Sequence, residues 1–265
     1  MIRYLEHAPS PALASYVECF WTSRADASAE LSGQHVLPDA CVDVVFDFSE
    51  SVVSAPRHDL RSYVVGAMTG ALSVQATGRV DMLGVRFRPG GAAAFLHLPL
   101  GEVRDDVLDV GSLSGGWEAA ARRLHAAEPH ERIPLLEAAL AIRLRSAATA
   151  ERLVGSAWSR LSASAGALPV ERLATELGVG RRRLERLFHE RFGLTPKEAA
   201  RVARFREVLA RMRRHPERPL GRLALEAGYY DQPHFNREFL RCAGVTPEAW
   251  RARRTAAAAE ASAPA

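Results

Sequence analysis

Several common features are scarce or missing in this sequence of 265 residues. Cysteine occurs only as Cys19, Cys41 and Cys242, an odd number at wide spacing, which argues against a disulfide framework and for a reducing compartment. No apolar run approaches the roughly 18 residues that a membrane-spanning helix needs. The N-terminus also lacks the basic and apolar regions of a signal peptide. We therefore expect a cytoplasmic protein that does not enter the membrane.

Motifs of catalysis are missing as well. The sequence has no glycine-rich phosphate loop, no serine nucleophile elbow and no paired-carboxylate motif. His35, Cys41 and Asp43 are metal-ligand types that lie close together, but neither an HxxxH nor a CxxC spacing accompanies them. We therefore predict no enzyme activity, no cofactor and no metal site. A buried Cys41 thiol and a hydrogen-bonded Asp43 carboxylate are the favoured interpretation.

Charge is unevenly distributed along the chain, although the net charge is only +4. Residues 150–254 hold 22 basic and 12 acidic residues, a net charge of +10, whereas residues 1–149 hold 13 basic and 18 acidic residues, a net charge of −5. Arginine supplies all of those 22 except Lys197, and arginine pairs with guanine edges and with phosphate. A GC-rich genome would also enrich arginine, so the asymmetry is the stronger signal. It predicts a polyanionic partner for the C-terminal half.

What the sequence does contain is an internal repeat. Residues 173–179 are similar to residues 223–229, at an offset of 50 residues. Residues 192–196 are similar to residues 243–247, at an offset of 51 residues. Each copy predicts a short helix with an apolar stripe, a turn at a glycine, and a second helix. Residues 196–214, between the copies, predict one long helix. The pattern is therefore a helix-turn-helix, present twice, with a linker helix.

The second helix of each copy has one apolar and one polar face. In a DNA-binding helix-turn-helix this helix lies in the major groove, so its polar side chains are candidate base contacts. A repeated helical pair that serves only for packing is the alternative, but two copies in register, with arginines opposite each stripe, favour DNA. The candidates are Arg181, Arg182, Glu185, Arg186 and His189 in the first copy, and Gln232, His234, Asn236, Arg237 and Arg241 in the second.

Residues 168–254 resemble the DNA-binding domain of the AraC/XylS family of bacterial transcription regulators. The matching motifs recur in order at 184–188, 193–196, 223–229, 235–239 and 244–247. The resemblance implies a double helix-turn-helix that binds specific DNA. Some relatives fuse this domain to a DNA-repair methyl acceptor, but that arrangement needs a four-cysteine zinc cluster, which three scattered cysteines cannot supply.

The N-terminal half predicts an α+β domain with a β-rich core followed by helices. Strand candidates lie at 36–48, 63–66, 72–76 and 80–88, and helix candidates at 92–98, 117–127 and 134–145. Residues 37–43 and 84–91 resemble an N-terminal domain from a subgroup of the same family, which implies effector binding or dimerisation. Arg86 and Arg88 are candidates for binding an anionic effector, although the solvated face of an edge strand is the favoured interpretation of both.

These observations combine into a two-domain prediction. Residues 1–149 form the effector-binding or dimerisation domain, 150–254 the all-α double helix-turn-helix domain, and 255–265 a disordered tail. The predicted function is a sequence-specific transcription regulator controlled by a small molecule. The alternatives are a ligand-independent regulator, controlled by its level or by a protein partner, and an enzyme fused to a DNA-binding domain. Candidate partners are double-stranded DNA, an unidentified effector, a second copy of the chain, and RNA polymerase, as for a transcription activator.

Overall fold

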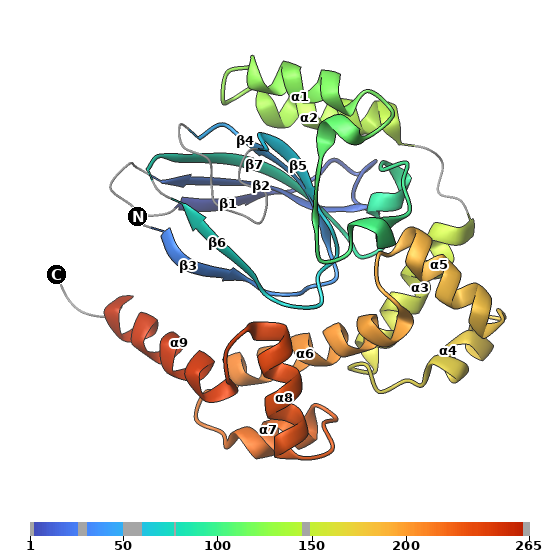
Figure 1. Ribbon diagram of the computed structural model, residues 1–265, viewed down its shortest axis with the longest axis vertical. Helices are drawn as coiled ribbons and strands as arrows, with labels where there is room; N and C mark the ends of the chain where they lie inside the picture. The colour runs from blue at the N-terminus through green and yellow to red at the C-terminus, as the bar shows by residue number, and fades with distance from the viewer. Residues whose placement is uncertain (1–2, 26–30, 50–59, 77, 145–148, 262–265) are drawn as a thin grey trace.

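The structure is a computed structural model. It describes residues 3–25, 31–49, 60–76, 78–144 and 149–261, and gives the backbone alone for 31–35, 75–76, 149 and 255–261. The chain folds into an N-terminal α+β part and a C-terminal helical part, which confirms the predicted fold class (Figure 1).

An antiparallel sheet forms the centre of the N-terminal domain. Its six described strands lie in the order β1-β2-β7-β4-β5-β8. Their bounds are β1 Arg3–His7, β2 Val17–Ala25, β4 Val42–Asp47, β5 Ser62–Val65, β7 Val80–Phe87 and β8 Val107–Asp109. A separate hairpin pairs β3 (Leu31–Val36) with β6 (Leu72–Ala76) and lies on the side of the sheet away from α1 and α2 (Figure 1).

The two faces of the sheet are covered differently. Along β7, Leu83, Val85 and Phe87 are buried on the face that carries the main core. The helices α1 (Trp117–His125) and α2 (Arg132–Arg143) cover this face. The opposite face carries a small cluster that includes Val45 and Met82, and the β3–β6 hairpin covers it.

Short 3-10 turns connect the sheet to the helices. They are η1 (Ala92–Ala94), η2 (Leu100–Val103) and η3 (Val110–Ser112). The helix predicted at 92–98 is therefore a single turn. The strands β1, β2 and β8, and most of β3, were not predicted from the sequence.

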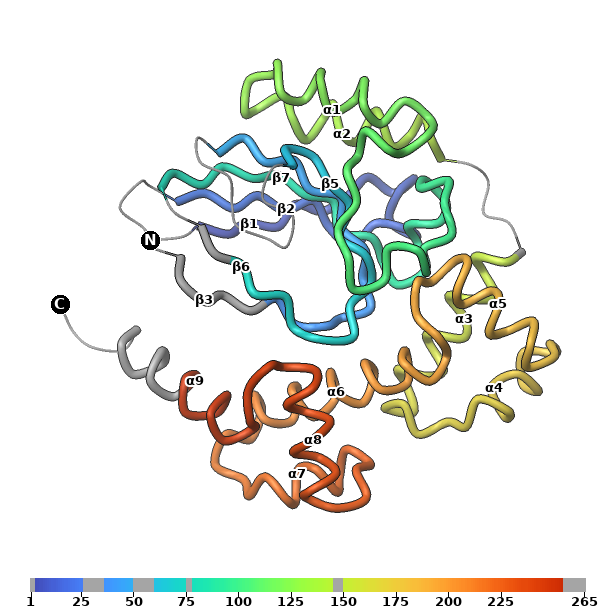
Figure 2. Tube along the Cα trace, in the orientation of Figure 1, coloured from blue at the N-terminus to red at the C-terminus, as the bar shows by residue number. Residues whose placement is uncertain are grey.

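The C-terminal half consists of helices α3 to α9. Their bounds are α3 Thr149–Ala163, α4 Val170–Glu176, α5 Arg181–Arg191, α6 Pro196–Arg214, α7 Leu220–Glu226, α8 Gln232–Ala243 and α9 Pro247–Ala261. The predicted linker helix is confirmed as α6, which runs between the two helix-turn-helix units (Figure 2). Thr195 and Glu198 form a capping box at its start. The helix α3 was not predicted.

The linker helix contributes to two apolar cores. Ala199 and Val202, near its start, pack into the core of the first unit. Phe205, Val208 and Met212, further along, belong to the core of the second unit. A single helix therefore fixes the spacing and the relative orientation of the two units.

The predicted tail is wrong in its first part. The helix α9 continues through Thr255 to Ala261, where the sequence is rich in alanine. Alanine has the highest helix propensity of any residue, so the run extends the helix that Pro247 starts. Residues 262–265 lie outside the described residues.

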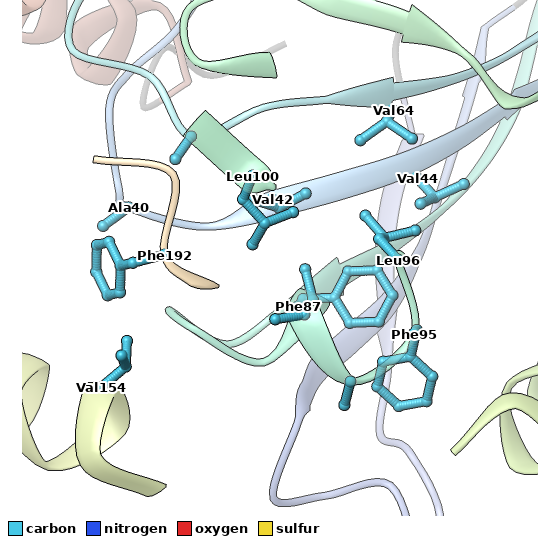
Figure 3. Close-up of a cluster of buried hydrophobic side chains, with 14 of the residues drawn as sticks. Ala40, Val42, Val44, Val64, Phe87, Phe95, Leu96, Leu100, Val154 and Phe192 are labelled. Atoms are coloured by element: carbon cyan, nitrogen blue, oxygen red, sulfur yellow. The ribbon is translucent and has the colours of Figure 1, made fainter. Parts of the chain in front are cut away.

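The first helix-turn-helix unit shares its core with the N-terminal domain. Phe192 and Val154 lie beside Ala40, Val42 and Leu100 in a continuous cluster of buried side chains (Figure 3). All five are at most 3% exposed. The two domains therefore meet at an apolar interface.

Candidate nucleic-acid interface and effector cavity

The first helix-turn-helix unit comprises α4, a turn and α5. Gly178 occupies the turn at a φ of +66°, a conformation that glycine adopts at little cost. Leu184, Leu187 and Phe188 form the buried side of α5. The opposite side of the helix is therefore the one available to a partner.

The predicted contacts on α5 differ in their surroundings. Arg182 and Arg186 are exposed, and the Arg186 side chain is 69% exposed with only a 3.8 Å ion pair to Glu190. Arg181 donates from Nε to Glu185 at 2.9 Å and also forms an ion pair with Glu171. The charges of the two predicted contacts, Arg181 and Glu185, are therefore partly neutralised within the chain.

His189 lies at the far end of α5. Its ring occupies the space beside Gly101 of η2, where a Cβ would have no room. The structure thus places this predicted DNA contact at the domain interface. The sequence could not show this, because the residue lies on the polar face of its own helix.

The second unit comprises α7, a turn and α8. Gly228 occupies its turn at a φ of +84°. Asp231 caps α8 as predicted, since its Oδ1 accepts a hydrogen bond from the His234 backbone N–H at 2.7 Å. The Tyr230 backbone N–H donates to Nδ1 of His234 at 3.3 Å. His234 therefore helps to hold the turn at the start of α8.

The remaining predicted contacts on α8 are mostly open. Gln232, Arg237 and Arg241 are exposed, while Asn236 is half-buried. Tyr230, which was not predicted as a site residue, is 87% exposed directly before the helix. Because α8 is the second helix of its helix-turn-helix unit, an exposed aromatic ring just before it is a candidate DNA contact. Only the structure shows that this ring is exposed.

A polar groove of about 870 Å³ joins the two units over α6. Arg181 and Glu185 line it from α5, and His234, Glu238 and Arg241 from α8. The linker helix adds three further cationic side chains, which were not predicted: Lys197, Arg201 and Arg204. The groove therefore connects the two reading helices by one charged surface.

A second cavity, of about 210 Å³, lies in the N-terminal domain between the sheet and the β3–β6 hairpin. Its lining is largely apolar, with Val45, Val65 and Met82 from the sheet and Leu72 and Val74 from the hairpin. A concave, largely apolar space with a few polar groups is typical of a small-molecule site.

The polar side chains of this cavity form one cluster around Asp43. Trp21 donates from Nε1 to Oδ1 of Asp43 at 2.7 Å, and Nε of Arg86 lies 3.4 Å from the same carboxylate. Arg86 also lies 3.7 Å from Asp39, whose Oδ1 accepts the Cys41 backbone N–H at 2.9 Å. The predicted hydrogen-bonded Asp43 is thus confirmed.

Burial dominates the electrostatics of the cluster. It raises the pKa of Asp43 to about 6, although Arg86 acts in the opposite direction. Burial also acts to lower the pKa of Arg86, but Asp43 and Asp39 outweigh it and raise that pKa. Burial raises the pKa of the Cys41 thiol well above its usual value. The thiol therefore stays neutral, beside a carboxylate that titrates near neutral pH.

The favoured interpretation of Arg86 as a solvated side chain is wrong. Alternation correctly placed it opposite Val85, but the hairpin covers that face, so Arg86 lines the cavity. Arg88 is exposed, pairs with Glu18, and does not line the cavity. Of the two predicted effector residues, only Arg86 lies at the candidate effector site.

The candidate metal ligands do not form a cluster in the part of the chain that the structure describes. No group of three or more histidine, cysteine, aspartate or glutamate side chains that could hold a metal occurs among the described residues. The side chain of His35 lies outside them. Likewise, none of the described helices has the length and apolarity that crossing a membrane requires.

Two segments connect the cavity to the DNA-binding domain. In residues 36–41, Leu37 lines the cavity and also packs against the core of the second unit. Arg206 of α6 donates from Nη1 to the backbone carbonyl of Asp39 at 3.0 Å. The β3–β4 connection therefore contacts both sites.

The second segment covers residues 66–72. Gly66, Met68 and Leu72 line the cavity. Between them, Ala67 approaches Gly193 at the end of the first unit so closely that a Cβ on that glycine would lie 3.3 Å from its methyl group. Nearby, Arg104 pairs with Glu198 of α6 at 3.1 Å.

Comparison with known proteins adds the following. A family model described as a helix-turn-helix domain matches residues 173–253, and one described as a domain of unknown function (DUF6597) matches residues 5–109. No curated protein sequence matches the chain.

Among solved structures, the chain is similar to ToxT from Vibrio cholerae, with 10% sequence identity, 94% of this chain and 97% of that chain covered, and a TM-score of 0.46. A ToxT structure with a bound unsaturated fatty acid gives 8% identity, 95% and 94% coverage and a TM-score of 0.44.

The family assignment depends on the C-terminal domain. The helix-turn-helix match spans α4 to α9 and therefore includes both units. The geometry agrees with it: two glycine turns, two exposed arginine-bearing helices and one capped linker helix recur in the order of the family's motifs. Residues 173–253 therefore form a DNA-binding helix-turn-helix domain, in agreement with the resemblance of this part of the sequence to the AraC/XylS regulators.

Proposed function

We propose that this transcription regulator reads DNA with α5 and α8, and that a small molecule in the N-terminal cavity controls its affinity for DNA. The observation that carries the proposal is that segments 36–41 and 66–72 line the cavity and also contact the DNA-binding domain. A ligand that moves either segment would change how the helix-turn-helix units are held.

For base contacts we propose Arg182 and Arg186 of the first unit and Gln232 and Arg237 of the second. All four are exposed. Arg182, Arg186 and Arg237 lie on the sides of α5 and α8 opposite the buried faces, and Gln232 is the first residue of α8. An arginine that pairs with guanine contributes about 1–3 kcal/mol of discrimination against a wrong base. Lys197 and Tyr230 are proposed as phosphate contacts, which position the protein but do not specify sequence.

Control by the cavity follows from the way the domains meet. The first unit shares an apolar core with the N-terminal domain, so it cannot reorient without disturbing Phe192 and its neighbours. The second unit contacts the N-terminal domain through Leu37 and through Gly70 and Ala71, which lie beside the end of α8. A change at Leu37 would therefore alter the spacing between α5 and α8, which must match successive major grooves about 34 Å apart.

We further propose that the chain acts in the cytoplasm without catalysing a reaction. RNA polymerase and a second copy of the chain remain candidate partners, because a regulator at a promoter commonly contacts one or both. Neither partner is needed for the DNA-binding step that the experiment below isolates.

The test is a DNA-affinity measurement on the full chain with its cavity filled. DNA sequences are first selected from a random pool, and the affinity for the selected DNA is then measured for the native chain, for Val65→Trp, which fills the cavity, and for Ile142→Trp. Ile142 is 84% exposed on α2, so its substitution adds the same ring far from the cavity.

We expect Val65→Trp to change DNA affinity at least about fivefold, a typical coupling free energy of 1 kcal/mol or more, and Ile142→Trp to leave it unchanged. Equal affinities for all three proteins would favour the ligand-independent alternative. Failure to select any sequence would contradict the DNA-binding step itself.

A further inference from the structure

The cavity of the N-terminal domain has an unusual charge balance for a site that holds an arginine. Its described lining contains two carboxyl groups, of Asp39 and Asp43, and one guanidinium group, of Arg86. The guanidinium lies within 3.7 Å of both carboxylates, so its charge is already balanced. With both carboxyl groups ionised, the cluster as a whole retains one negative charge, which an incoming ligand would meet.

We propose that the cavity binds a small organic cation, an amine or quaternary ammonium with a compact apolar body, whose charge is held between Asp39, Asp43 and the ring of Trp21. This inference rests on the proposed function and names the chemical class of its effector. It replaces the anionic effector that the arginines alone suggested.

The aromatic lining supports a cation. Trp21 lies over Gly84 of β7, where no Cβ could fit, so one face of the indole rests on the sheet. Tyr4 stacks beside it, with 6.1 Å between ring centroids. Tyr63 lines the same cavity. The face of an indole or phenol ring attracts an ammonium group, most strongly where water is excluded.

The hydrogen bond from Trp21 to Asp43 joins the ring to the carboxylate. It fixes the indole edge on Oδ1 at 2.7 Å and so places the ring and the negative charge side by side. An ammonium group that contacts Asp39 and Asp43 therefore also lies near the indole. An anion in the same place would face two carboxylates and would have to draw Arg86 away from them.

The size and the apolar lining define the rest of the ligand. The cavity of about 210 Å³ is smaller than the roughly 300–1,000 Å³ of sites for drug-sized ligands. Met68 and Met82 line it, and methionine adapts readily to irregular apolar shapes. A single phenyl ring on a short chain is a suitable body.

The test compares three probes that share the 2-phenylethyl body and carry a cationic, a neutral or an anionic head group: 2-phenylethylammonium, 2-phenylethanol and 3-phenylpropanoate. Binding to the full chain is measured by calorimetry at pH 8, with tryptophan fluorescence as a second readout. We expect the cation to bind at least about tenfold more tightly than either of the others. Tighter binding of the anion, equal binding of all three, or no binding of the cation would overturn the inference.

Two variants and one control locate the charge that holds the cation. Asp43→Asn and Asp39→Asn should each weaken the cation about tenfold or more and leave the neutral alcohol within about twofold. General damage to the cavity would weaken both probes, so equal losses would overturn the assignment of these carboxylates. Asp39 is partly exposed, so its variant is the one expected to keep the fold. Glu118→Gln removes one negative charge from α1, away from this cavity, and should change nothing.

DNA affinity measured in the same samples separates this inference from the proposed function. If the cation binds and DNA affinity changes, the result supports both the cation site and the control of DNA binding by the cavity. If the cation binds and DNA affinity is unchanged, the cation site stands and its role as an effector site is overturned. If cavity filling at Val65 changes DNA affinity but the anion is the preferred probe, control by the cavity stands and the cation assignment is overturned.

Discussion

At the scale of single residues, sequence patterns located polar positions well but could not show what covers them. Alternation along β7 placed Arg86 opposite the core, which is correct, but the hairpin that covers this second face comes from other parts of the chain. His189 stays exposed, but its ring also contacts Gly101 of η2, which lies in the other domain. Periodicity reports which face of an element is polar, and only tertiary packing decides whether that face meets solvent.

Arg186 gives a direct test of base reading. We expect Arg186→Ala to cost about 1–3 kcal/mol on the selected DNA and much less on random DNA, because a base contact distinguishes sequences. Fluorescence anisotropy on both DNAs measures the two losses. Arg172→Ala, which removes a 73% exposed arginine from α4, is the matched control. Equal losses on both DNAs would instead identify Arg186 as a phosphate contact.

Asp43 predicts a pH dependence of stability. Its pKa is raised from 3.8 to about 6 in the folded chain, mainly by burial. A raised carboxyl pKa contributes stability that is complete below the unfolded pKa and is lost as pH rises through the folded value. The free energy of unfolding, compared with that of Asp43→Asn, should therefore fall between about pH 4 and pH 6.

Urea unfolding of the two proteins across this pH range measures the difference, with Glu118→Gln as a control for the loss of one exposed charge. The opposite slope would mean that the attraction of Arg86 outweighs the burial of Asp43.

At the scale of elements, local signals predicted the helical repeat closely. The glycine turns at Gly178 and Gly228 and the bounds of α6 agree with the sequence expectation, because turn, cap and stripe all act within a few residues. The strand β1 is different. Four of its five residues are exposed, and it exists because it pairs with β2, which no local pattern encodes.

The cap of α6 can be tested at this scale. Thr195 accepts the Glu198 backbone N–H at 3.2 Å, and the Glu198 carboxylate accepts the Thr195 backbone N–H at 2.8 Å. Thr195→Ala should lower the free energy of unfolding by about 0.5–2 kcal/mol. Thr175→Ala is the control, because that exposed threonine lies inside α4 and bonds only the Glu171 carbonyl. Equal effects of the two substitutions in thermal or urea unfolding would show that the cap contributes nothing.

At the scale of the whole molecule, the sequence predicted two domains but not how they join. The sequence correctly placed Phe192 in the core of the first helix-turn-helix unit. The same core continues into the N-terminal domain through Ala40 and Leu100. The sequence pattern of an apolar residue does not distinguish a core within one domain from an interface between two. The double contact of Leu37, with the cavity and with the core of the second unit, could not be predicted for the same reason.

The charge of the DNA-binding half predicts how affinity responds to salt. Residues 150–254 carry a net charge of +10. If about six phosphates are neutralised, affinity should fall roughly a thousandfold between 50 and 200 mM salt, because bound counterions are released. A titration of the full chain on random DNA measures the slope, and a flat response would contradict this interpretation of the charge.

The central claim is that two helix-turn-helix units read DNA together, and hydroxyl-radical footprinting of the full chain on selected DNA tests it most directly. We expect protected backbone sugars beside two neighbouring major-groove segments about 10 base pairs apart. Arg186→Ala should weaken one segment first and Arg237→Ala the other. A single protected segment, or two segments that respond identically to both substitutions, would contradict it.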